Sequence, residues 1–157
     1  MTRGLIIGKF APLHKGHEML IEKALKEVDE LVIVVYDAPK QTNISLNDRS
    51  NWIKVLYPSV RVILADNVPK DKGYTENIQN KHVQYILSLL GKQKIHKLFS
   101  SEDYGEKMSK ALQCENILVD KERVEIPITG TLIRSNPEKY KAYLSTHVFN
   151  DMMKSWR

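Results

Sequence analysis

The sequence predicts an α/β protein, with a Rossmann-like, doubly wound parallel sheet and helices on both faces. Short runs of β-branched and apolar residues, such as 31–36, are typical of interior parallel strands. Between these runs apolar residues recur at helical spacing, as at Leu20, Ile21 and Ala24. Because parallel strands need crossover connections, this alternation places the helices on the two faces of one sheet.

The predicted elements follow one another without a linker, so we expect a single domain over residues 1–157. Pro58 and Gly91 are suited to end the second and third helices, and Thr75 is suited to cap the third. The expected strands are 5–7, 31–36, 60–64, 97–100 and 117–119, with 124–128 continuing or flanking the last. The expected helices are 16–28, 47–57, 75–90, 105–112, 131–134, 137–144 and 148–156.

Composition and charge narrow the classes of partner. The formal net charge of +5 and the pI of about 9.2 favour anionic ligands such as nucleotides. No arginine-rich run is interleaved with aromatic residues, so we expect no nucleic acid partner. Cys114 is the single cysteine, which excludes an internal disulfide and fits a reducing, cytoplasmic compartment. No apolar stretch has the length of a signal peptide or a bilayer span, so we expect no membrane association.

The most informative segment is the turn at 8–17, between the first strand and the first helix. His14 and His17 fall at the helix start, where free backbone N–H groups and the positive end of the dipole attract anions. Gly16 lets a ligand approach the backbone, and Lys9 adds a charged donor. These features favour a phosphate-binding loop, while a chance pair of helix-start histidines, one of them a cap, is the structural alternative.

A second segment near the other end of the chain has similar features. Gly130 and Thr131 start a short predicted helix, and Thr131 is suited to act as a cap or hydroxyl donor. Arg134 adds a planar, permanently charged guanidinium that matches phosphate, although a solvated arginine is the structural alternative. Neither a Gly-x-Gly-x-x-Gly fingerprint nor a Gly-x-x-x-x-Gly-Lys-Ser/Thr loop is present, which leaves the histidine loop as the phosphate candidate.

Together the two segments resemble the paired signatures of the nucleotidylyltransferases. The first is His-x-Gly-His at 14–17, and the second is Ile-Ser-Gly-Thr-x-Ile-Arg at 128–134, where Thr129 replaces the serine. These α/β enzymes transfer a nucleoside monophosphate from a nucleoside triphosphate and release pyrophosphate. The resemblance implies catalytic roles for His14, His17 and Arg134. It implies phosphate-binding roles for Gly8, Lys9, Phe10, Gly16, Gly130, Thr131 and Ile133.

A third segment, Ser-Ser-Glu-Asp-Tyr-Gly at 100–105, is similar to the adenylyltransferase domain of the bifunctional bacterial NAD-biosynthesis regulators. Those domains form NAD from ATP and nicotinamide mononucleotide. The similarity extends to Arg-x-x-Trp at 49–52 and Arg-x-x-Pro at 134–137, so it covers almost the whole chain. It implies nucleotide or acceptor contacts for Ser100, Glu102, Asp103, Tyr104, Arg49, Trp52 and Tyr74.

One departure from that family concerns residues 66–90, where its members usually carry tryptophan and this chain has none. We expect Tyr74 or Trp52 to stack on the nicotinamide ring in its place, unless the acceptor differs. A core position is the structural alternative for Trp52. The missing tryptophan leaves open adenylyl or cytidylyl transfer to another small phosphate acceptor, such as phosphopantetheine or a ribose phosphate.

The resemblance implies that an acceptor phosphate oxygen attacks the α-phosphorus of ATP in line, without a covalent enzyme intermediate. We expect His17 to contact the α-phosphate, and His14, Lys9 and Arg134 to hold the triphosphate. No cluster of Asp and Glu is spaced as a metal cage, so we expect the cofactor Mg²⁺ to be held by substrate phosphates and water.

Two further questions stay open from the sequence. A nucleotide-sensing module that binds ATP or NAD without turnover is a third functional hypothesis, which the intact His14, His17 and Arg134 disfavour. The apolar residues of the 149–156 segment are suited to cover either a core edge or a second subunit, so homo-oligomerisation is open.

Overall fold

The computed structural model describes residues 1–157 except 72, 74, 102–104, 121–122 and 156–157. The described residues form a five-stranded sheet, all parallel, in the order β3-β2-β1-β4-β5. This arrangement confirms the predicted fold class. The strands are β1 (Arg3–Gly8), β2 (Glu30–Tyr36), β3 (Arg61–Ala65), β4 (Lys97–Ser100) and β5 (Glu115–Leu118).

The helices alternate with these strands, as the sequence predicts. Ser45 and Thr75 cap two of the helices, since each side-chain oxygen accepts the backbone N–H three residues on. Gly91 ends the third helix with a φ of 62°, a conformation that favours glycine. The helices are α1 (Lys15–Glu27), α2 (Leu46–Leu56), α3 (Glu76–Leu90), α4 (Gly105–Leu112), α5 (Gly130–Ser135), the 3₁₀ helix η1 (Lys141–Tyr143) and α6 (Thr146–Ser155).

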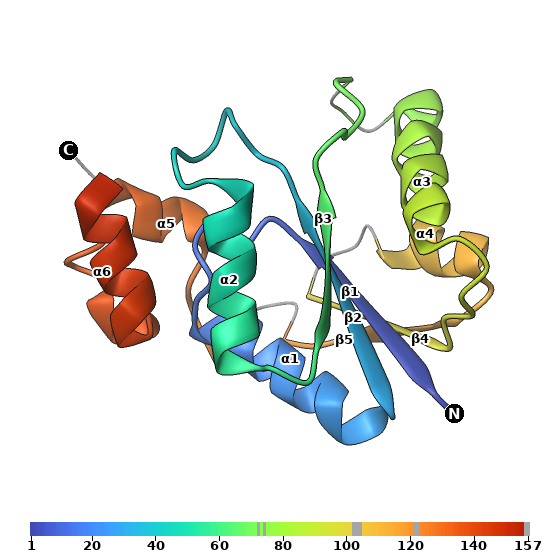
Figure 1. Ribbon diagram of the computed structural model, residues 1–157, viewed down its shortest axis with the longest axis horizontal. Helices are drawn as coiled ribbons and strands as arrows, with labels where there is room; N and C mark the ends of the chain where they lie inside the picture. The colour runs from blue at the N-terminus through green and yellow to red at the C-terminus, as the bar shows by residue number, and fades with distance from the viewer. Residues whose placement is uncertain (72, 74, 102–104, 121–122, 156–157) are drawn as a thin grey trace.

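The sheet is covered on both faces, and β2 shows this most clearly. Its residues from Leu31 to Val35 are all buried, because successive side chains enter opposite layers. Ile33 and Val35 pack in the layer that holds α1, α2 and α6, whereas Val32 and Val34 pack in the layer that holds α3 and α4. Figure 1 shows the same division, with α3 and α4 on the right of the strands, α2, α5 and α6 on the left, and α1 along the bottom.

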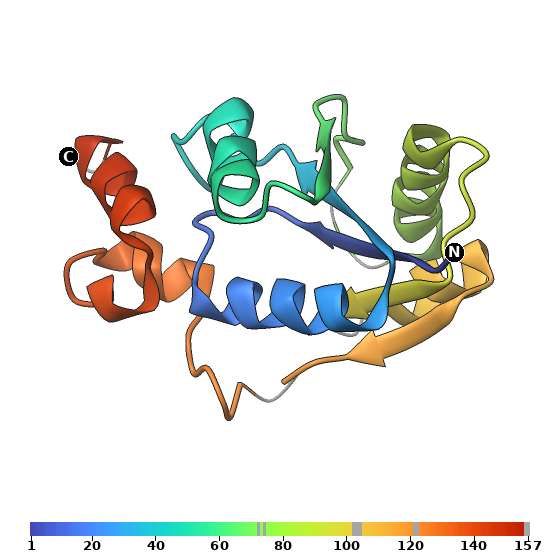
Figure 2. The same ribbon diagram turned by 60° about the horizontal axis from the view of Figure 1, so that its bottom comes forward.

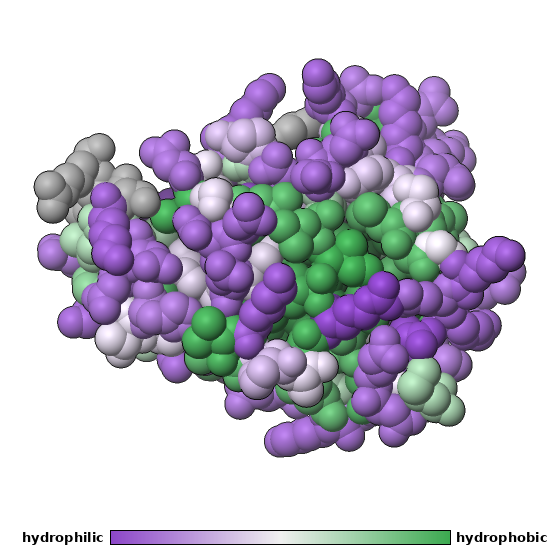
Figure 3. Space-filling view, in the orientation of Figure 1, coloured by the Kyte–Doolittle hydropathy of each residue, from purple (hydrophilic) through white to green (hydrophobic). Residues whose placement is uncertain are grey.

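The edge strand β3 is less buried than the strands inside the sheet. Val62, Ile63 and Leu64 are each half-buried, and only Ala65 at the end of the strand is fully covered. In the view of Figure 3 apolar surface gathers in the middle of the molecule, and polar side chains surround it. The exposed edge is short, which limits unwanted pairing with another chain.

The strand order changes direction between β1 and β4, which lie side by side at the centre of the sheet. In doubly wound sheets a ligand binds beyond the carboxyl ends of the strands at such a point. The loop after β1, with its two histidines, begins at this position. The fold therefore places the predicted phosphate-binding loop where the topology favours a ligand.

Two predicted elements near the carboxyl terminus are wrong. The segment 124–128 is irregular and not a strand, because the carboxylate of Asp120 accepts the backbone N–H groups of Val124, Glu125 and Ile126, and Pro127 has none. The predicted helix at 137–144 is reduced to the single turn of η1, since so short a segment gains few helical hydrogen bonds for each residue fixed.

Candidate nucleotide-binding site

A pocket of about 1190 Å³ opens at the carboxyl ends of β1, β2 and β4. Its wall combines the loop after β1 with the starts of α1 and α5 and with side chains from α3 and α4. Ten of the predicted site residues line it. They are Gly8, Lys9, Phe10, His14, Gly16, His17, Ser100, Gly130, Thr131 and Arg134.

The two histidines cap α1 reciprocally. His14 is the N-cap, and its Nδ1 accepts the backbone N–H groups of Gly16 at 3.1 Å and His17 at 3.4 Å. In return the backbone N–H of His14 donates to Nδ1 of His17 at 3.2 Å. The rings stack with their centroids 3.7 Å apart. The sequence left two interpretations of this histidine pair, a helix cap and a phosphate-binding loop. The structure shows the cap, and it also places both rings in the wall of the pocket, so one interpretation does not exclude the other.

This arrangement fixes the protonation of both rings. A nitrogen that accepts a hydrogen bond carries no proton, so each neutral ring carries its proton on Nε2. Burial, followed by the positive charge of Arg123, lowers the pKa of His14 to about 4. Burial, with His14 and Arg123 beside it, holds the pKa of His17 well below its ordinary value. The site therefore presents two neutral imidazoles whose Nε2–H groups are hydrogen-bond donors.

Gly16 is required between the histidines by close packing. A Cβ at this position would lie 2.9 Å from Cε1 of His14, within contact distance of the capping ring. The ring of Phe10 packs edge-on against His17, with the centroids 4.8 Å apart, and Phe10 itself has a φ of 51°. The loop after β1 is thus closely packed around the histidine pair.

The start of α5 joins this loop although it lies far away in the sequence. Nη1 of Arg134 donates to the carbonyl oxygen of Ala11 at 2.6 Å, and Nη2 donates to Oγ1 of Thr131 at 3.3 Å. Thr129 caps the helix, since its Oγ1 accepts the N–H of Leu132 at 3.2 Å. A Cβ on Gly130 would lie 3.1 Å from the carbonyl oxygen of Ala11, so the two segments meet backbone to backbone.

We call this part of the pocket the phosphate end (His14, Gly16, His17, Gly130, Thr131 and Arg134). It combines two neutral N–H donors, a guanidinium and the amino-terminal ends of α1 and α5. Such a set is complementary to a chain of phosphates.

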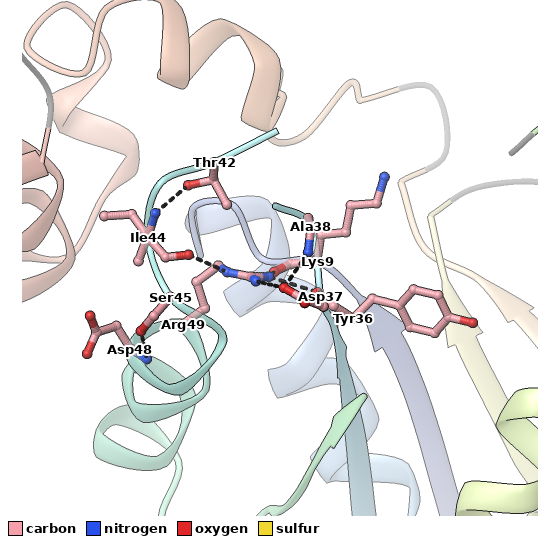
Figure 4. A network of polar contacts seen from close by, with 9 residues as sticks. All are labelled: Lys9, Tyr36, Asp37, Ala38, Thr42, Ile44, Ser45, Asp48 and Arg49. Carbon is pink, nitrogen blue, oxygen red and sulfur yellow. Dashed lines mark hydrogen bonds and ion pairs between the residues drawn. The ribbon is translucent and has the colours of Figure 1, made fainter. Parts of the chain in front are cut away.

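Arg49 lies behind the pocket and not in its wall, which corrects the expectation of a substrate contact. Its side chain is 1% exposed, and its guanidinium donates to the carbonyl oxygens of Lys9 at 2.7 Å and Tyr36 at 2.8 Å. It also donates to the carbonyl oxygen of Ile44 and contacts the carboxylate of Asp37 at 3.5 Å (Figure 4). Arg49 therefore ties the loop after β1 to the end of β2.

Two other predicted residues also lie in the core. Trp52 is 1% exposed, and its Nε1 donates to a carboxylate oxygen of Asp151 on α6 at 2.7 Å, so its ring is not placed to stack on a substrate. Ile133 is fully buried inside α5. The expected acceptor contact of Trp52 and the expected phosphate contact of Ile133 are both corrected, because the two side chains pack in the core and the backbone N–H of Ile133 donates to the carbonyl oxygen of Thr129. Tyr74, Glu102, Asp103 and Tyr104 lie outside the described residues.

Three pocket residues that the sequence does not single out contribute to the chemistry of the site, namely Arg123, Tyr36 and His82. Arg123 precedes the segment 124–126, whose backbone N–H groups donate to the carboxylate of Asp120. It lies close enough to His14 and His17 to lower the pKa of both. Tyr36 at the end of β2 and His82 on α3 face the pocket from the other side. A polar residue at the carboxyl end of the second strand was the one available signal, and it pointed to Tyr36 alone.

Two further features concern the described residues alone. No group of three or more His, Cys, Asp or Glu side chains is placed to hold a metal ion among them. Within the same residues no helix has both the length and the apolar character needed to cross a bilayer.

The fold and the site together define an α/β protein whose pocket has a set of donors complementary to phosphates. The chain belongs to the cytidylyltransferase-like family, whose sequence profile matches residues 5–136. Family membership confirms the resemblance to the nucleotidylyltransferases.

The chain is also similar to individual proteins of this kind. The trifunctional NAD biosynthesis/regulator protein NadR of Salmonella typhimurium is 28% identical over 162 residues, which cover 92% of this chain and 39% of the relative. The chain therefore spans about two-fifths of that relative's length. A nicotinamide-nucleotide adenylyltransferase of Halobacterium salinarum is 53% identical over 38 residues, 24% of this chain and 22% of the relative. A crystal structure of NadR in complex with NAD and AMP-PNP shares the fold, with a TM-score of 0.70 and 21% identity over 96% of this chain and 46% of that one.

Proposed function

We propose that this protein is a nicotinamide-nucleotide adenylyltransferase, which transfers AMP from ATP to nicotinamide mononucleotide and releases pyrophosphate. Family membership supports nucleotidyl transfer, and the named activities of the relatives support this nucleotide and this acceptor. The observation that carries the proposal is the reciprocal capping of His14 and His17, which leaves two Nε2–H donors beside Arg134.

The reaction needs alignment and charge stabilisation rather than a nucleophile from the enzyme. One phosphate oxygen of nicotinamide mononucleotide attacks the α-phosphorus of ATP, and the bond from that phosphorus to the bridging oxygen of the β-phosphate breaks. The electron pair of that bond leaves with pyrophosphate, so atoms and charge balance without a proton transfer. The acceptor phosphate is ionised at neutral pH, so no general base is required.

His17 and His14 act as donors to the phosphate oxygens on which charge develops. Because their pKa values lie below the ordinary range, both rings stay neutral and do not lose the Nδ1 acceptors that hold α1 in place. A preorganised donor of this kind contributes about 2.7 to 4 kcal/mol to the transition state. Arg134 and the amino-terminal end of α5 hold the leaving pyrophosphate.

Arg123 adds a second guanidinium to the phosphate end. It lines the pocket and lies beside both histidines, in a loop that three hydrogen bonds to Asp120 keep in shape. A cation at this position contributes to the binding of ATP, because the triphosphate carries several negative charges.

Mg²⁺ is part of the proposal and would neutralise charge on the phosphates when bound. The described residues offer hydrogen-bond donors to the phosphates and no set of metal-ligating side chains, which suits a metal held by substrate oxygens and water.

The test is a panel of nucleotides and acceptors in which pyrophosphate release is measured. ATP and CTP are each paired with nicotinamide mononucleotide, phosphopantetheine and ribose 5-phosphate. We expect release with ATP and nicotinamide mononucleotide, at a rate at least about tenfold above every other pair. Release with another acceptor alone would replace the acceptor, and tight nucleotide binding without any release would favour a sensing module.

A further inference from the structure

The pocket has a second part, away from the phosphate end, between the end of β2 and the inner side of α3. We call it the β2–α3 arm (Tyr36, Gln41, Gln79, His82, Val83 and Ile86). Its wall combines the ring of Tyr36 and the aliphatic side chains of Val83 and Ile86 with the polar groups of Gln41, Gln79 and His82. Apolar surface with a few convergent polar groups suits a flat organic ring that carries a polar substituent. None of these described residues is Lys or Arg.

The polar groups of the arm form an ordered chain. The hydroxyl of Tyr36 lies 3.1 Å from Nδ1 of His82, and Nε2 of the same ring lies 3.1 Å from the carbonyl oxygen of Asp71. The ring of Tyr36 is held edge-on by Tyr85, with the centroids 6.0 Å apart. Its backbone carbonyl is held by Arg49, and its side chain projects away from that contact (Figure 4). The hydroxyl is thus fixed in position.

The direction of each hydrogen bond in this chain follows from its last member. A carbonyl oxygen can only accept, so Nε2 of His82 must carry a proton and donate to Asp71. In the neutral ring Nδ1 is then an acceptor, and the hydroxyl of Tyr36 must donate to it. Burial raises the pKa of Tyr36, so its hydroxyl keeps the proton that it donates. Because that proton is engaged, the oxygen of Tyr36 can only accept a hydrogen bond from a ligand.

Charge indicates which of the two substrate rings enters the arm. The pyridinium ring of nicotinamide mononucleotide is cationic, and a cation is favoured beside an aromatic face and away from other cations. The part of the pocket beyond β4 carries Lys107, Lys110 and Glu106, and Lys110 pairs with Glu106 at 3.4 Å. The described charges there leave one lysine in excess, which disfavours a cationic ring and suits a neutral purine. The β2–α3 arm therefore fits the acceptor ring better than it fits adenine.

From this geometry we propose that Tyr36, oriented by His82, selects an acceptor that carries a carboxamide over one that carries a carboxylate. This inference rests on the proposed adenylyl transfer, and it identifies the carboxamide as the group of the acceptor that the protein recognises. A carboxamide N–H donates to the oxygen of Tyr36, whereas a carboxylate has no proton to donate and meets the lone pairs of that oxygen. Tyr36 is thus a specificity-determining residue, and His82 is a positioning residue.

The test measures the binding and turnover of nicotinamide mononucleotide and of nicotinic acid mononucleotide, which differ only in this group. Dissociation constants come from calorimetric titration of the whole protein, and KM and kcat come from NAD or deamido-NAD formation with ATP. In Tyr36→Phe we expect the KM for the amide to rise about tenfold, with kcat and the KM for ATP little changed.

His82→Ala supplies the second variant, because it keeps the hydroxyl but frees its proton. Tyr36 can then donate to a carboxylate, so we expect the KM for the acid to fall about tenfold while that for the amide changes less. A purely structural role for His82 would change both acceptors equally. Tyr85→Phe is the matched control, since the hydroxyl of Tyr85 accepts a backbone N–H from Asn67 and Tyr85 does not line the pocket.

Several results would overturn the inference. An unchanged ratio of amide to acid in both variants would remove Tyr36 and His82 from selection. A rise in the KM for ATP alone in Tyr36→Phe would place adenine in the arm. A wild-type protein that binds neither acceptor would also overturn it. Preferential binding of the amide without any NAD formed would instead defeat the proposed function and leave this inference standing.

Discussion

At the phosphate end of the pocket, donors come from two short segments and are held largely by backbone hydrogen bonds. The β2–α3 arm is different, because its key groups are side chains that lie 46 residues apart and orient one another. The first arrangement offers fixed donors to any phosphate chain, whatever base it carries. Under our proposal the second arrangement recognises the carboxamide on the acceptor ring. Under the proposed function, turnover depends on the first region and the choice of acceptor depends on the second.

The largest expected effect is that of His17→Ala on turnover. Loss of one preorganised donor should lower kcat about 100-fold to 1000-fold, by analogy with the deletion of an oxyanion-hole donor. Because the phosphates are common to both acceptors, the ratio of amide to acid should stay as in the wild type. Steady-state kinetics with both acceptors, on a variant shown to be folded by its melting curve, checks this. If the preference for the amide over the acid changed while kcat fell little, His17 would act in acceptor choice, and the assignment of turnover to the phosphate end would be wrong.

Arg49→Met should affect both regions, because Arg49 binds the carbonyl oxygens of Lys9 and Tyr36. Removing the guanidinium leaves these buried carbonyls unsatisfied, and we expect the free energy of unfolding to fall by about 3 kcal/mol. Denaturant unfolding measures this change. Arg61→Met is the matched control, since Arg61 is exposed on β3, and its effect should stay within about 0.5 kcal/mol. Equal effects of the two substitutions would contradict the supporting role of Arg49.

Acid should destabilise the phosphate end through the histidine cap. The fold holds the pKa of His14 at about 4, below its ordinary value of 6.5. As the pH falls from 6.5 toward 4 the unfolded chain takes up a proton that folded His14 does not, so stability is lost over that window, by up to about 3 kcal/mol. Below about 4 both states are protonated and His14 contributes no further loss.

The control for this pH effect is His14→Asn, because asparagine caps a helix but does not titrate. Denaturant unfolding at several pH values should give a flatter dependence between pH 6.5 and 4.5 in the variant than in the wild type. Parallel curves for the two proteins would show that His14 titrates normally in the folded state.

The smallest expected effect is that of Asp120→Asn, which weakens the loop that carries Arg123. The amide has one acceptor oxygen where the carboxylate uses two, so part of the set of three backbone hydrogen bonds is lost. We expect the KM for ATP to rise about threefold and the choice of acceptor to remain unchanged. Asp48→Asn on the exposed start of α2 is the control. If the KM for the acceptor rose more than the KM for ATP, Arg123 would belong to the acceptor site and not to the phosphate end.

Much of the fold was predictable because its signals are local. The β-branched run of β2, the cap at Thr75 and the glycine at 91 each mark an element through its own residues. The order of the strands has no such signal, since pairing of β1 with β4 joins segments more than 90 residues apart. The strand predicted at 124–128 does not form, because Asp120, which lies outside that segment, accepts its backbone N–H groups.

The same distinction between local signals and long-range contacts applies to the candidate site. The histidine loop and the start of α5 carry motifs, so His14, His17 and Arg134 are predictable from the sequence, and the structure brings them together in one pocket. Arg49 and Trp52 belong to equally recognisable patterns but support the site from the core, and a sequence does not separate these two uses. Tyr36 and His82 are common residues without a motif, and their role follows only from the hydrogen bonds between them.

The central claim is adenylyl transfer to nicotinamide mononucleotide by the phosphate end, and phosphorus NMR tests it most directly. ATP, nicotinamide mononucleotide and Mg²⁺ are incubated with the wild type and with His17→Ala, and the products are followed in one spectrum. We predict that the wild type forms NAD and pyrophosphate in equal amounts and that His17→Ala forms both at least about 100-fold more slowly. Pyrophosphate or phosphate appearing without NAD, or full activity in a folded His17→Ala variant, would contradict the account.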